Sequence, residues 1–221
     1  MSVRRKLVPA IALALALLAL YSAFDLFWPR HEDFRQFDAA AVGSLETRMW
    51  RSYYGRRPAA LFLELAETLR TQYHFPFLRS YLGAYHATSA AFTFKEGKQR
   101  SDYERALPAL RSYFTALHNT GSIDFDVRRA AELELEWWIV HRERARHAPG
   151  DLGHACAAAA AILYALPVER TLEHGELRAQ AMLIRDAAEE RGEVSEGEWN
   201  AIESLLHRSY GSLHRAAAGS N

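Results

Sequence analysis

Five side chains in the second half of the chain have the chemistry of metal ligands. Glu134 and His141 are seven residues apart, so a helix would place them on one face with about 10.5 Å of rise between them. Glu176 follows later, and His207 and His214 are again seven apart near the C-terminus. Carboxylate oxygen and imidazole nitrogen suit iron or manganese, and helical bundles hold such ions between facing helices. One hypothesis is therefore a metal-dependent oxidase or oxygenase.

The order of these residues resembles the ligand order of the heme-oxygenase-like di-iron oxidases. That family has Glu-x6-His, then Glu, then His-x3-Asp-x2-His. In this chain Gly211 occupies the position of the family's aspartate, so one ligand of the resemblance is missing. The resemblance implies a di-iron centre within a helical bundle.

A second set of polar residues falls on helix faces that are otherwise apolar. Charged groups in such places need partners, because burying an unpaired charge is costly. We expect Arg79 to pair with Glu46 or Glu134, either as a structural network or around a functional cavity. The predicted buried polar network comprises Glu46, Arg79, His86, Glu134, His141, Glu176 and Gln180.

Clustered aromatic residues support a third hypothesis, a cavity for an apolar ligand. The candidate lining residues are Trp50, Tyr53, Tyr73, Trp137 and Trp138. The simpler interpretation is that these side chains pack a core. A cavity of several hundred Å³ lined by Trp50, Tyr73 and Trp137 would favour a ligand carrier.

Helical periodicity without any sustained alternation of period two predicts an all-α fold. Gly, Pro and capping residues delimit the helices, with capping boxes expected at Ser101/Glu104 and Ser195/Glu198 and a kink at Pro108. The predicted helices span 38–55, 58–75, 76–94, 101–118, 126–147, 151–166, 168–191 and 195–217. Short connections predict seven or eight antiparallel helices, possibly repeat-like, in one domain over 31–217, with a frayed tail at 218–221.

Composition narrows the classes of protein. Lys+Arg and Asp+Glu both total 27, so the net charge is zero and gives no electrostatic basis for nucleic-acid binding. A single cysteine excludes an intrachain disulfide and any cysteine-based zinc cluster.

The first thirty residues predict a membrane anchor. Arg4, Arg5 and Lys6 precede an apolar segment over 7–28, whose length of about 33 Å spans a bilayer. The alternatives are a cleaved signal peptide or a buried N-terminal helix. Signal cleavage requires small residues at positions −3 and −1, but Tyr21 or Leu20 would stand at position −3. The basic N-terminus predicts a single-pass protein with its N-terminus in the cytoplasm and its helical domain outside.

The leading functional hypothesis is a non-enzymatic, membrane-tethered helical domain that binds a protein partner or supports a complex. It rests on fold-level analogy, because no phosphate loop, zinc-protease or nucleophile-elbow motif occurs. The sequence assigns no catalytic residue and predicts no cofactor, with iron or manganese as the alternative.

Overall fold

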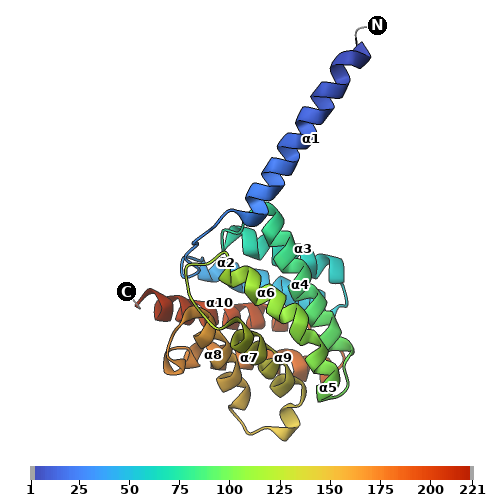
Figure 1. Ribbon diagram of the computed structural model, residues 1–221. Helices are drawn as coiled ribbons and strands as arrows, with labels where there is room; N and C mark the ends of the chain where they lie inside the picture. The colour runs from blue at the N-terminus through green and yellow to red at the C-terminus, as the bar shows by residue number, and fades with distance from the viewer. Residues whose placement is uncertain (1–2, 220–221) are drawn as a thin grey trace.

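The computed structural model describes residues 3–219, which form an all-α fold without a β-strand in that range, as predicted (Figure 1). The helices are α1 (Val3–Phe27), α2 (Ala39–Tyr54), α3 (Pro58–Thr71), α4 (Phe77–Glu96), α5 (Arg100–Tyr103), α6 (Leu107–His118), α7 (Val127–Arg142), α8 (Asp151–Tyr164), α9 (Leu172–Glu190) and α10 (Glu196–Ala218).

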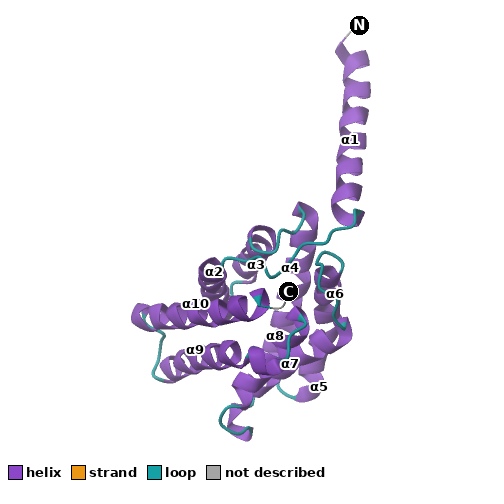
Figure 2. Ribbon diagram, turned by 90° about the vertical axis from the view of Figure 1, so that its left-hand side faces the viewer, coloured by secondary structure: helices purple, strands orange, loops and turns teal. Residues whose placement is uncertain are grey.

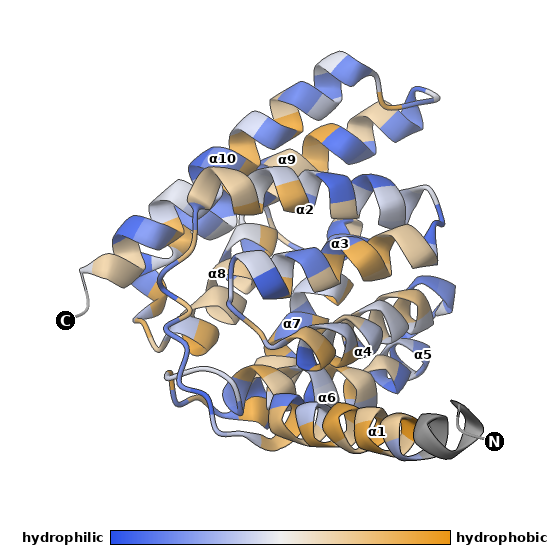
Figure 3. Cartoon of the chain, turned by 90° about the horizontal axis from the view of Figure 1, so that it is seen from above, coloured by the Kyte–Doolittle hydropathy of each residue, from blue (hydrophilic) through white to orange (hydrophobic). Residues whose placement is uncertain are grey.

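Helix α1 projects away from the other helices and is long and apolar enough, over Pro9–Phe27, to cross a membrane (Figures 1 and 3). Most of its large side chains over residues 9–27 are exposed. Leu20 is 66% exposed and Phe27 is 78% exposed. Such an apolar surface is stable in lipid and costly in water.

The end of α1 is fixed to the start of α4 by Asp25. Its carboxylate accepts hydrogen bonds from the backbone N–H groups of Leu78 and Arg79, at 3.0 and 3.2 Å. The residue that precedes α4, Pro76, makes no side-chain cap, so Asp25 supplies that cap from another helix. Arg79 Nε donates in return to the Asp25 carbonyl oxygen at 2.7 Å, and only 4% of Asp25 is exposed.

The remaining long helices form a closed ring. Neighbours along the chain pack side by side from α2 to α3, α4, α6, α7, α8, α9 and α10, and α10 packs back onto α2 (Figure 2). Short connections make these neighbours antiparallel, so alternate helices begin at the same end of the ring. One face of every ring helix is therefore directed at a shared interior.

Capping residues set several helix starts. The side chains of Asp38 and Asp126 cap α2 and α7, and Ser195 with Glu198 forms the predicted capping box of α10. The predicted capping box at Ser101 is absent, because α5 begins at Arg100 without a side-chain cap.

The helix predicted over 101–118 is divided by a 3₁₀ turn at Glu104–Ala106. Pro108 is the second residue of α6, a position that needs no intrahelical N–H, so it begins a helix and does not kink one. The helix predicted over 126–147 ends at Arg142, and that predicted over 168–191 begins at Leu172. In the predicted tail, Ala218 still belongs to α10, and residues 220–221 lie outside the described residues.

Helices α8 and α9 approach each other through two glycines. A Cβ atom placed on Gly175 would lie 2.1 Å from the carbonyl oxygen of Gly153, closer than any real contact. Glycine at this crossing therefore sets the distance between the two helix backbones.

The segment between α1 and α2 closes one end of the ring with aromatic rings. Phe34 is 1% exposed and packs edge-on against Tyr73, with centroids 5.5 Å apart. Phe37 packs against Tyr164 at 6.1 Å. This aromatic plug covers the interior of the ring at that end.

Candidate functional site

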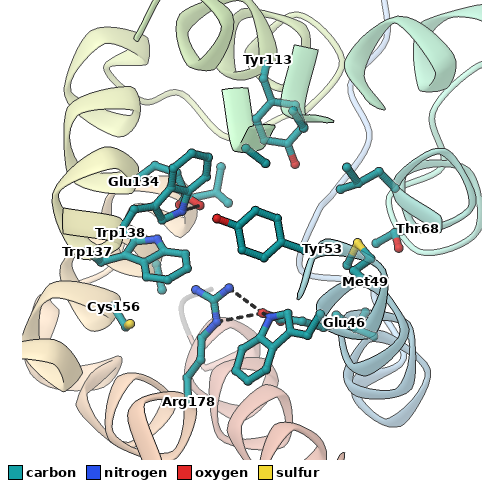
Figure 4. A pocket seen from close by; sticks show the side chains of 18 of the residues that line it. Glu46, Met49, Tyr53, Thr68, Tyr113, Glu134, Trp137, Trp138, Cys156 and Arg178 are labelled. Atoms are coloured by element: carbon teal, nitrogen blue, oxygen red, sulfur yellow. Dashed lines mark hydrogen bonds and ion pairs between the residues drawn. The ribbon is translucent and has the colours of Figure 1, made fainter. Parts of the chain in front are cut away.

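The interior of the ring contains a cavity of about 290 Å³. All eight long ring helices contribute to its wall, which is mainly aromatic and aliphatic. The five aromatic residues of the ligand-cavity hypothesis all lie in this wall: Trp50, Tyr53, Tyr73, Trp137 and Trp138. Figure 4 shows Tyr53, Trp137 and Trp138 among them. The five residues come from α2, α7 and the turn after α3, so only ring closure brings them together.

Glu46 lies in this wall as a buried carboxylate, with 3% of its surface exposed. It accepts hydrogen bonds from Trp50 Nε1 at 3.0 Å, from Arg178 Nε at 3.0 Å, and from the Tyr210 hydroxyl. These donors come from α2, α9 and α10. The carboxylate thus links the first helix of the ring to the last two.

The surroundings of the Glu46–Arg178 ion pair favour the charged form of both residues. Burial alone would raise the pKa of Glu46, but the Arg178 guanidinium and the Tyr210 hydroxyl outweigh burial and lower it. The same pairing raises the pKa of Arg178 against its own desolvation. The guanidinium also lies over the Trp137 ring, 4.5 Å from its centroid, as a cation–π contact.

Glu134 is a second cavity carboxyl group, and it has no cationic hydrogen-bond partner. Trp138 Nε1 donates to its Oε1 at 3.0 Å, whereas Oε2 accepts no hydrogen bond from a described residue (Figure 4). Trp137 Nε1 lies near this carboxyl group but outside hydrogen-bonding geometry, and it has no other partner in the described chain. Burial raises the pKa of Glu134.

Two further titratable groups of the wall are neutral. His174 is 4% exposed, its Nδ1 lies 2.8 Å from Ser209 Oγ, and burial lowers its pKa to about 4. Burial raises the pKa of Cys156 to about 12, so its sulfur is a thiol and not a nucleophilic thiolate.

The predicted polar network is divided between separate places. Glu46 and Glu134 face the cavity, but Arg79 does not reach them. Arg79 is 8% exposed and binds Asp25 where α1 meets α4. Arg178, and not Arg79, pairs with Glu46. His86 is half-buried on the outer side of α4, with its ring 5.5 Å from that of Tyr85.

The remaining network residues lie on α7 and α9. His141 lines the edge of the cavity and pairs with Asp186 at 3.0 Å. Asp186 also forms an ion pair with Arg144 at 3.0 Å. Burial would raise the pKa of Asp186, but these partners lower it. Glu176 and Gln180 are exposed, so they belong to no buried network.

The residues predicted as metal ligands do not converge. Glu134 faces the cavity and His141 binds Asp186, while Glu176 points to the surface. His207 Nε2 lies 2.9 Å from Ser44 Oγ, and the His214 ring packs on Phe37 at 5.3 Å. Across residues 3–219, no three His, Cys, Asp or Glu side chains form a group that could hold a metal ion. The donor set therefore does not fit a di-iron or manganese centre.

No protein-family model matches the chain, and searches of curated proteins and of solved structures also found no match.

Proposed function

We propose that the protein is a membrane-anchored binding protein that holds a small, predominantly apolar ligand inside its ring of helices. The observation that carries this proposal is the cavity of about 290 Å³ bounded by Trp50, Tyr73 and Trp137. Ligand pockets are of about 300–1,000 Å³, mainly apolar, and contain a few fixed polar groups. The ring interior has this character, with Glu46, Glu134 and Arg178 as its charged groups.

Buried ionic groups add weight to the proposal. A core built only for stability gains little from a carboxylate–guanidinium pair, because hydrophobic replacements are often equally stable. Glu134 adds a carboxyl group whose second oxygen accepts no hydrogen bond from a described residue. A polar ligand group in the cavity would supply that hydrogen bond.

We place the ring outside the cytoplasmic membrane, with α1 as a retained single-pass anchor. The cluster Arg4, Arg5 and Lys6 favours a cytoplasmic N-terminus under the positive-inside rule. Retention is also favoured by the poor fit of the residues near Ala23 to a signal-cleavage site, since Tyr21 would stand at position −3. Protease treatment of intact spheroplasts tests the topology: digestion of the domain is expected, and its protection would reverse the orientation.

The hypothesis that the helical domain binds a protein partner or supports a complex stays a prediction. No described surface favours one particular partner. A metal-dependent oxidase has no converged ligand set to support it.

Bromobenzene is a suitable neutral probe, because its heavy atom quenches tryptophan fluorescence and the cavity wall contains three indoles. We expect saturable quenching of the full chain in detergent, with free probe measured by equilibrium dialysis. The double variant Ala87→Phe/Ala159→Phe fills the cavity from α4 and α8 and should weaken quenching by about tenfold or more.

The matched control is Ala187→Phe/Ala201→Phe, which adds the same volume at exposed positions. Its quenching should equal that of the unmodified chain. Equal quenching in the cavity-filled variant would contradict the proposal, because the probe would then bind elsewhere.

A further inference from the structure

The cavity wall has more carboxyl groups than basic partners for them. Among the described lining residues, Glu46 and Glu134 are carboxyl groups and Arg178 is the one guanidinium. His174 is neutral, and His141, at the edge of the cavity, is paired with Asp186. One positive charge inside the cavity would therefore make it neutral with both carboxylates ionised.

Arg178 does not supply that charge to Glu134. Its Nε and Nη2 atoms both donate to Glu46 Oε1, and its guanidinium is held over the Trp137 ring. Within residues 3–219, the one hydrogen bond to the Glu134 carboxyl group comes from the neutral indole N–H of Trp138, at 3.0 Å. Its Oε2 atom is left for a group that enters the cavity.

The surroundings of Glu134 suit a cation with an apolar body. Tyr113 and Tyr53 line the cavity with it, and Figure 4 shows the hydroxyl end of Tyr53 directed toward the carboxyl group. The Tyr53 ring already has Lys95 Nζ over it, 4.1 Å from the ring centroid, so Tyr113 offers the ring without a protein cation among the contacts of the described residues. The Tyr113 hydroxyl, like Glu134 Oε2, makes no hydrogen bond to a described residue. Aromatic faces attract cations by about 0.5–2 kcal/mol, more where water is excluded.

We propose that the ligand carries a single positive charge on an apolar body, as a hydrophobic amine or quaternary ammonium ion does, and that Glu134 is its counter-ion. This inference rests on the proposed ligand-binding function and specifies its ligand class. The cation would lie between Glu134 and Tyr113, with its apolar part against the indoles and the aliphatic wall.

The test compares benzyltrimethylammonium with neopentylbenzene, its neutral isostere, in equilibrium dialysis against the full chain in detergent. We expect the cation to bind about tenfold more tightly than the isostere after correction for micelle partitioning. Glu134→Gln should abolish this preference and leave the affinity for neopentylbenzene unchanged, which also reports an intact cavity. Glu134→Asp should retain part of the preference, because it keeps the charge.

Glu176→Gln is the matched control, since it removes an exposed carboxylate from α9, and it should behave as the unmodified chain. If the two probes bind equally, or if Glu134→Gln still prefers the cation, the charge assignment is overturned while the proposed function stands. If neither probe binds the unmodified chain, the proposed function fails together with this inference.

Discussion

Replacing Arg178 with methionine would leave Glu46 as a buried carboxylate without its cation. Breaking a buried ion pair from one side costs about 3–5 kcal/mol. Glu46 would keep its hydrogen bonds from Trp50 and Tyr210, which favours the lower end of that range. Loss of the cation–π contact with Trp137 adds about 1 kcal/mol. We therefore expect a loss of about 4 kcal/mol, a large share of the stability of a typical domain.

The assay is urea unfolding of the full chain in mild detergent, followed by tryptophan fluorescence. Glu46→Gln/Arg178→Met should recover about 2 kcal/mol or more of the loss, because no charge is then left buried and unpaired. Arg208→Met, which removes an exposed arginine from α10, is the control and should be nearly neutral. A loss below about 1 kcal/mol for Arg178→Met would refute the argument that this pair joins α2 to α9 and α10.

Three further changes test other parts of the fold. Gly175→Ala should cost about 3 kcal/mol or more, because its Cβ would clash with the carbonyl oxygen of Gly153, whereas Gly197→Ala in the first turn of α10 should be neutral or stabilising. The pKa of His174 is about 4 in the folded chain and 6.5 in the unfolded chain, so the unfolded chain takes up the proton first as the pH falls. The contribution of His174 to stability should therefore be complete above about pH 6.5 and decline by about 3 kcal/mol towards pH 4. Asp25→Ala should remove a helix cap worth about 1–2 kcal/mol and speed proteolysis of the segment between α1 and α2.

Each of these expectations has a contrary outcome. Equal unfolding midpoints for Gly175→Ala and Gly197→Ala would show that α8 and α9 have room to separate. If His174→Gln has the same pH dependence of stability as the unmodified chain, another group is responsible. Unchanged proteolysis of Asp25→Ala would show that α1 is not held by its contact with α4.

The sequence predicted the helices and the aromatic residues of the cavity, because both follow from local pattern. Glu46 and Glu134 were identified since each is a carboxylate on an apolar helix face. Glu176 and Gln180 were misplaced because the large residues of α9 gave a misleading helix phase. Leu183 is 47% exposed, whereas small residues and Arg178 face inward.

The local sequence pattern does not predict contacts between helices that are distant in the chain. Asp25 lies in an otherwise apolar segment, and nothing near it in sequence indicates that it caps α4, more than fifty residues later. The packing of α10 on α2, which closes the ring, is similarly non-local. Arg178 was missed for the same reason, because an arginine on a helix with several charges has no special signal until its partner on α2 is known.

Crystals of the full chain soaked in bromobenzene would show whether the ring of helices holds a ligand site. We expect a bromine anomalous peak inside the ring, between Trp50, Tyr73 and Trp137, that is lost in Ala87→Phe/Ala159→Phe. Bromine found only along α1 or on the outer surface, with an unoccupied ring interior, would contradict this expectation.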